Sequence, residues 1–181
     1  MDLLDRLLGH DAWTTKQLLD LSRGLTEAQL DREFDLGPGT LLKTLGHIVR
    51  NVEVWGALME GMPASEIRKL ISGGDSREDS GGESGGKSGG GSIEALIERH
   101  EKAASTLAKV SQEVSKRGAW DATWLDSLDD PPTEKTYGGA IAHVISHSMH
   151  HRGQALYMLR RLGVEGVPEG DVLSWENQLD S

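Results

Sequence analysis

The chain has 181 residues, with 19 basic and 29 acidic side chains, a formal net charge of −10 and no cysteine. This length suits one domain, which we expect to cover residues 1–181. The absence of cysteine excludes disulfides, thiolate metal sites and a cysteine nucleophile. The acidic balance argues against nucleic acid and against anionic lipid as the main partner, because both attract cationic surfaces.

The sequence carries no sign of membrane insertion or export. No apolar run approaches the roughly 20 residues that span a bilayer. Asp2 and Asp5 stand where a secretory signal would be basic. We therefore expect a soluble, cytoplasmic protein that does not associate with membranes.

Four segments have the apolar spacing of amphipathic helices. The first covers about residues 2–22 and is followed by a glycine. The second begins at Thr40, an expected N-cap, and its apolar positions over 41–59 alternate spacings of four and three. The third covers about 92–116, and the fourth follows two glycines and covers about 140–162. Four helices of this length predict an all-α fold, a four-helix bundle.

The segments between and after these helices have different compositions. Residues 72–92 hold 9 glycines and 6 serines among 21 positions, which predicts a flexible loop, of natural or engineered origin, between the second and third helices. Residues 118–137 are expected to form a long loop that two tryptophans pin to the helices. The acidic tail after the fourth helix is expected to be extended and anchored by Val172 and Trp175.

Histidines cluster on the fourth predicted helix. On a helical wheel four of them share one face, opposite the apolar stripe. His147 and His151 are spaced i, i+4, so their imidazoles can converge on one divalent ion. The alternative is a solvated polar face. The four are His143, His147, His150 and His151.

The pattern alone does not identify a third ligand. His47 lies beside the apolar seam of its predicted helix, and the positions of His10 and His100 favour metal binding no more than that of His47 does. Two polar residues next to the histidines carry further expectations. Arg152 falls inside the apolar stripe, where it either pairs with a buried carboxylate or guides an anionic substrate. Gln154 lies on the histidine face and is expected to hydrogen-bond near the site.

Three longer segments together form a specific pattern. LLGHDAWTTKQLLDLSRGLTEAQL is an opening helix with a tryptophan and trailing leucines. In GTLLKTLGHIVRNVEVWGALMEG, His47 is followed by Glu53 and then Trp55. AHVISHSMHHRGQALYMLRRLGV contains an HxxxHRGQ motif. With these segments the chain resembles the DinB/YfiT-like superfamily of bacterial metal-binding four-helix proteins, apart from residues 61–92.

The resemblance implies a metal site. The three metal-binding histidines of that superfamily fall on His47, His147 and His151, whereas His143 and His150 match no ligand position. The sequence departs from the family at Thr15, where an asparagine is common, and in the Gly/Ser-rich segment. Relatives are commonly homodimers, so a homodimer is expected here too.

The resemblance also implies a chemistry. Three imidazoles hold a divalent ion, zinc or nickel with manganese or iron as alternatives, and leave one position open to a reactant. Family members include thiol-dependent S-transferases and metal-dependent hydrolases, so we expect a small-molecule substrate and, for the first class, a low-molecular-weight thiol. Glu53 is the candidate catalytic residue, as general base or as acceptor for a ligand imidazole; the alternative is a solvated carboxylate. The competing hypotheses are a non-catalytic metal-binding or stress-response protein and a scaffold with a vestigial site.

Overall fold

The computed structural model describes residues 1–74 and 92–179, and within them the chain is mostly helical. The predicted all-α class is therefore confirmed. A single two-stranded hairpin accompanies the helices in the described part. The elements are α1 (Leu3–Ser22), α2 (Glu27–Leu30), α3 (Leu41–Met59), α4 (Ala64–Gly74), α5 (Ile93–Arg117), β1 (Thr123–Asp126), β2 (Thr133–Thr136), α6 (Tyr137–Arg161) and α7 (Val172–Leu179).

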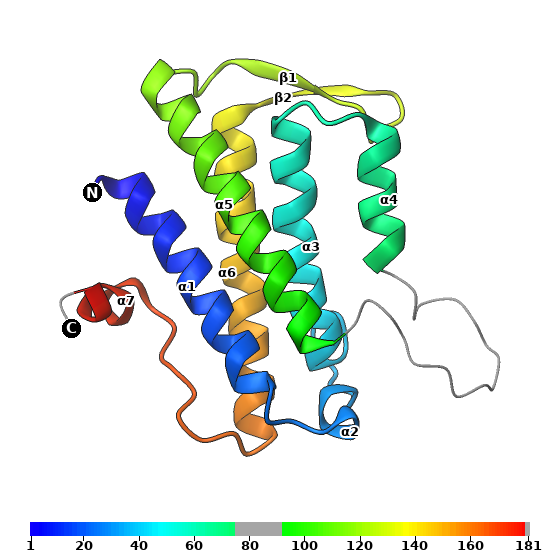
Figure 1. Ribbon diagram of the computed structural model, residues 1–181, viewed down its shortest axis with the longest axis vertical. Coiled ribbons are helices and arrows are strands. Elements are labelled where there is room, and N and C mark those ends of the chain that lie inside the picture. Colours follow the sequence, from blue (N-terminus) through cyan, green and yellow to red (C-terminus); the bar gives the residue numbers. More distant parts are fainter. Residues whose placement is uncertain (75–91, 180–181) are drawn as a thin grey trace.

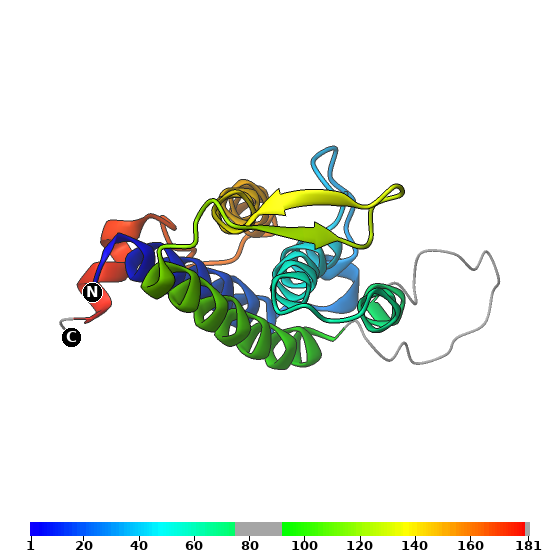
Figure 2. The same cartoon turned by 90° about the horizontal axis from the view of Figure 1, so that it is seen from above.

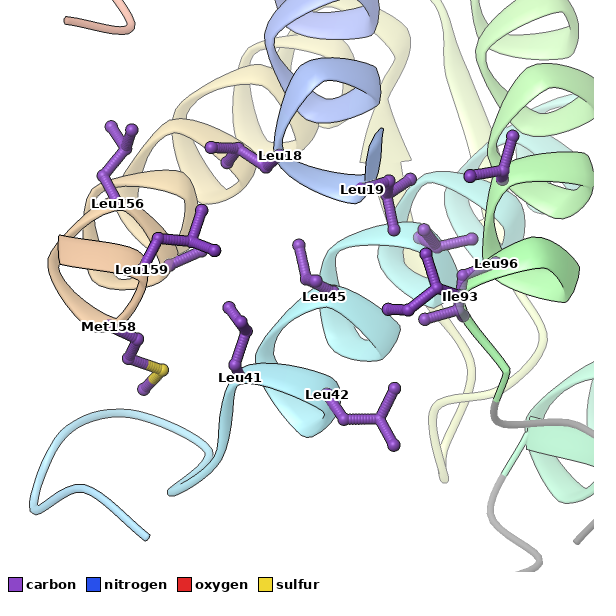
Figure 3. Packing of buried hydrophobic residues seen from close by; sticks show 13 residues of the cluster. Leu18, Leu19, Leu41, Leu42, Leu45, Ile93, Leu96, Leu156, Met158 and Leu159 are labelled. Atoms are coloured by element: carbon purple, nitrogen blue, oxygen red, sulfur yellow. The ribbon is translucent and has the colours of Figure 1, made fainter. Parts of the chain in front are cut away.

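The long helices α1, α3, α5 and α6 pack lengthwise against one another (Figure 1). Both α1 and α3 lie against α5 and α6. Seen from above, α3 and α6 are viewed almost along their axes, whereas α1 and α5 run obliquely beside each other (Figure 2). Leucines from all sides fill the space between them, as the close view of one cluster shows (Figure 3). Burial of this kind contributes roughly 1.5–3 kcal/mol per large side chain. The cluster includes Leu18, Leu41, Leu45, Leu96 and Leu159.

Local signals fix where these helices begin and end. Thr40 is the N-cap of α3, and its hydroxyl accepts a hydrogen bond from the backbone N–H of Lys43 at 3.2 Å, as predicted. Gly118 ends α5 in the left-handed conformation, with φ of 60°, which favours glycine. The predicted bounds of the four long helices agree with the observed ones to within a few residues.

The connecting segments differ from the sequence-based expectations in four places. Two of these are the helices α2 and α4, which were not predicted. Residues 118–137 contain a hairpin, in which β1 pairs antiparallel with β2 and Thr123 faces Thr136. The tail is not extended throughout, because Val172–Leu179 forms α7. Asp171 caps this helix by accepting the backbone N–H of Ser174 at 3.0 Å. Trp175 is buried, as its predicted anchoring role requires.

The Gly/Ser-rich segment lies largely outside the described residues. Its first three residues, 72–74, belong to the end of α4 rather than to a loop. The rest of the expected flexible loop falls on residues 75–91, which the structure does not describe. That residues 1–181 form one domain stays a prediction. Within the described ranges, no helix is both long and apolar enough to cross a membrane.

Candidate metal centre

Three histidines from two helices meet on one side of the structure. His47 comes from α3, and His147 and His151 come from consecutive turns of α6. One nitrogen of each ring lies within 4.8 Å of the other two. The Nε2 atoms of His47 and His147 are 3.3 Å apart. Two nitrogens bound at about 2.05 Å to one tetrahedral ion stand about 3.3 Å apart, so the observed spacing suits a shared divalent ion.

The packing of α3 against α6 explains why these rings converge. His47 sits at the edge of the apolar seam of α3, beside the fully buried Ile48, and that edge faces α6. On α6, Val144 and Ser148 are buried, which leaves His147 half-buried at the border of the same contact. The apolar stripes therefore dock the two helices and bring their flanking histidines together.

Burial and mutual repulsion favour the neutral form of two of these rings, His47 and His147. The pKa of His147 is lowered from its usual 6.5 to about 4, first by burial and then by the nearby charges that His151 and His47 would carry. Burial also lowers the pKa of His47. A neutral imidazole offers the lone pair that a metal ion needs, and nitrogen donors are what zinc and related ions accept. The donor set therefore fits a divalent metal.

The far nitrogens of two of these rings have different environments. The Nδ1–H of His151 donates a hydrogen bond to Oε1 of Gln154 at 2.7 Å, which confirms the expectation that Gln154 bonds near the site. The Nδ1 atom of His147 is buried and has no hydrogen-bond partner among the described residues. The orientation of His151 is thus set by a side chain, and that of His147 by packing.

The remaining histidines are placed away from this group or at its margin. His143 is exposed, with its ring centroid 5.2 Å from that of His147 and 5.0 Å from that of Trp55. The Nε2 atoms of His10 and His100 lie 2.9 Å from backbone carbonyl oxygens of Gly170 and Ala12, respectively. Of the open alternatives for a third nitrogen, the structure brings only His47 to the pair on α6, among the residues described.

Glu53, the candidate catalytic residue, lies on a different side of α3. Its carboxylate accepts two hydrogen bonds from Arg99 of α5, at 2.9 Å from Nε and 2.5 Å from a terminal nitrogen. No hydrogen bond joins it to the three histidines in the part of the chain that is described. Its role as base or histidine acceptor therefore stays a prediction that none of its observed contacts supports.

Arg152 pairs with a buried carboxylate, which is the first of its two predicted roles. Its guanidinium forms an ion pair with Asp11 of α1, and both side chains are almost completely buried. The pair points away from the histidine face and ties α6 to α1. The wheel position of Arg152 predicted a buried carboxylate partner, but only the fold identifies Asp11 as that partner.

The fold and the histidine group define a class: a mostly helical protein with three nitrogen donors converging between two long helices. The family model of the DinB superfamily matches residues 10–155, which cover all three histidines. The chain belongs to the DinB superfamily. Searches of curated proteins and of solved structures gave no match.

Proposed function

We propose that this protein is a divalent-metal-dependent enzyme that acts on a small molecule, with His47, His147 and His151 as the metal ligands. The observation that carries the proposal is the convergence of three ring nitrogens from α3 and α6, two of them 3.3 Å apart. On an ordinary solvated face, nothing would hold three imidazole rings at this spacing. Membership of the DinB superfamily supports the same assignment.

A centre with three protein ligands leaves a coordination position for a reactant. A divalent ion held by neutral imidazoles retains its charge and lowers the pKa of a water or thiol that binds there. The chain's own contribution is to hold three imidazole rings together at the border of a packed interface. The lowered pKa of His147 serves this role, because it keeps protons off the ligand nitrogen at neutral pH.

The reaction we propose is thiol S-transfer or hydrolysis. Because the chain has no cysteine, a sulfur nucleophile must arrive with a cosubstrate, a low-molecular-weight thiol. Zinc and nickel are the proposed ions, since imidazole suits both, with manganese and iron as alternatives. The lack of cysteine also suits the reducing cytoplasm, our proposed location. A homodimer, common among the proteins this sequence resembles, is proposed as the working assembly.

One observation favours a non-catalytic alternative. The predicted acid–base residue, Glu53, is engaged by Arg99 instead of bonding to the histidines. Metal binding without turnover, as in a metal buffer or stress-response protein, requires no such group. A scaffold with a vestigial site would require no metal at all. The three functions therefore differ in two measurable properties, metal content and turnover.

Elemental analysis of the purified protein tests the site first. We expect about one divalent ion per chain, and loss of that ion in His151→Ala. His143→Ala is the matched control, because His143 lies on the same helix face but matches no ligand position, and it should retain the ion. Equal metal content in His151→Ala and in the unmodified chain would refute the ligand assignment. An absence of metal from every sample reloaded with zinc or nickel would point to a vestigial site.

Turnover is tested next with the metal-loaded protein. Thiol–electrophile pairs report S-transfer, and activated esters report hydrolysis. The rate must exceed that of the same concentration of free metal and must fall in His151→Ala. A loaded protein that is no faster than free metal with either substrate class would favour the non-catalytic alternative.

A further inference from the structure

The side chain of Gln154 lies between two adjacent histidines of α6. Its Oε1 atom is 2.7 Å from Nδ1 of His151, and its Nε2 atom is 3.0 Å from Nε2 of His150. Of the three histidines that converge, only His151 has its far nitrogen held by a side chain in a hydrogen bond that the structure records. Gln154 is one turn beyond His151 on the same helix, so the contact is local and well defined.

The amide has one productive orientation toward a metal ligand. A neutral imidazole carries hydrogen on one nitrogen and a lone pair on the other. When Nδ1–H of His151 donates to the amide oxygen, Nε2 keeps its lone pair for an ion. The amide nitrogen then donates to Nε2 of His150, so the amide bonds a donor on one side and an acceptor on the other. With the amide reversed, His151 would carry its hydrogen on the nitrogen that the metal needs.

The backbone at Gly37 passes close to this amide. Gly37 has a φ of 55°, in the left-handed region, and lies in the loop that precedes α3. A Cβ atom built there would overlap Oε1 of Gln154 and would stand 2.7 Å from its Cδ. Such contacts are far inside van der Waals separation, so the loop backbone approaches the amide only because residue 37 lacks a side chain.

We infer that Gln154, supported by the backbone at Gly37, is a positioning residue that presents Nε2 of His151 to the metal ion. This inference rests on the metal site of the proposed function and adds to it the group that fixes one ligand. Partners of this kind set the tautomer and the ring orientation of metal-binding histidines, and their loss typically lowers metal affinity 10–100-fold.

Zinc binding by the full chain tests the inference, with affinity measured by competition against a chelator. We expect Gln154→Ala to bind zinc about 10–100-fold more weakly than the unmodified protein. Gln154→Glu keeps an oxygen acceptor for His151 and should retain the affinity. Alanine is the best helix former, so the first substitution should leave the thermal midpoint of the metal-free protein close to its original value.

A readout that does not depend on metal follows the tautomer directly. Nitrogen NMR of the metal-free protein at neutral pH should show hydrogen on Nδ1 of His151 in the unmodified chain and in Gln154→Glu. Gln154→Ala should lose this preference. A purely structural role for Gln154 would leave the tautomer of His151 unchanged.

Glycine substitutions test the support from the loop. Gly37→Ala should weaken zinc binding, because the new Cβ displaces the amide oxygen. Gly39→Ala is the matched control: it also places a side chain at positive φ, 95°, in the same loop, but its Cβ meets nothing within 4 Å. In the Gln154→Ala background, Gly37→Ala should cause no further loss of zinc affinity, since the amide is already gone.

The outcomes separate this inference from the proposed function. If the unmodified protein binds no zinc, the metal site itself is wrong. If it binds zinc and Gln154→Ala binds within about 3-fold of it, the positioning role is wrong while the site stands. Equal loss in Gln154→Ala and Gln154→Glu would also overturn the role, because an acceptor at this position would then have no effect.

Discussion

Removal of the carboxylate of Asp11 should destabilise the protein strongly. Asp11 and Arg152 keep only 4% and 3% of their side-chain surface exposed, and they join α1 to α6. Another nitrogen of the same guanidinium is already buried without a partner among the described residues. In Asp11→Ala the positive charge stays in the interior with little compensation. Breaking a buried pair in this way costs about 3–5 kcal/mol, a large part of the 5–15 kcal/mol typical of total stability.

Urea and thermal unfolding of the metal-free protein measure this cost. A chain of this size changes its thermal midpoint by about 2–4 °C per kcal/mol, so the midpoint should fall by about 6–20 °C. Glu66→Ala is the control, because its ion pair with Lys69 is exposed and should contribute less than about 1 kcal/mol. The double variant Asp11→Leu/Arg152→Met should be more stable than Asp11→Ala, since it leaves no charge buried. A cost below about 1 kcal/mol for Asp11→Ala would refute the reasoning.

Three further predictions concern single residues. Thr40→Ala removes the N-cap of α3 and should lower the free energy of unfolding by about 1 kcal/mol in urea titrations; no change would mean that water replaces the hydroxyl fully. In metal-free protein followed by NMR, the His147 ring should titrate at about 4, whereas in the unfolded chain it titrates near 6.5. Between these values the unfolded chain binds more protons, so metal-free stability should fall as the pH drops from about 6.5 toward 4; a ring that titrates near 6.5 in the folded protein contradicts this. Glu53→Gln should leave the metal content unchanged, because its carboxylate bonds Arg99, and loss of the ion on elemental analysis would show that Glu53 supports the ligands after all.

Local patterns predicted the elements whose causes lie within a few residues. The start of α3 followed from Thr40 and the glycine turn before it, because capping involves only the first turn of a helix. The pairing of His147 with His151 followed from their i, i+4 spacing on α6. The place of Arg152 inside an apolar stripe indicated a buried partner for the same reason.

Features that depend on distant parts of the chain could not be derived in this way. On the wheel His47 was only a residue beside a seam, because the convergence of its ring with α6 depends on how two helices 100 residues apart pack together. Only the resemblance to the family assigned His47 as the third ligand. The partners Asp11 and Arg99 likewise depend on helix packing.

The missed elements are helices α2, α4 and α7 and the two strands, none of them longer than the 11 residues of α4. The strands β1 and β2 have four residues each, too few for an alternating pattern to stand out. Helix α7 has eight residues, and its start was signalled by Asp171, which caps it. Reading Asp171 as an N-cap before Trp175 would have predicted this helix.

The separation of His47 and His147 along the chain has a consequence for the whole molecule. A cation that grips both rings closes a loop of about 100 residues, and in doing so it fastens α3 to α6. A ligand that binds only the native state raises the free energy of unfolding by about 2.7 kcal/mol when its concentration is 100 times its dissociation constant. The resistance of the protein to heat and to proteases would then increase with the metal concentration around it. A change in that concentration would alter the stability of all the packed helices and not only the geometry of the three rings.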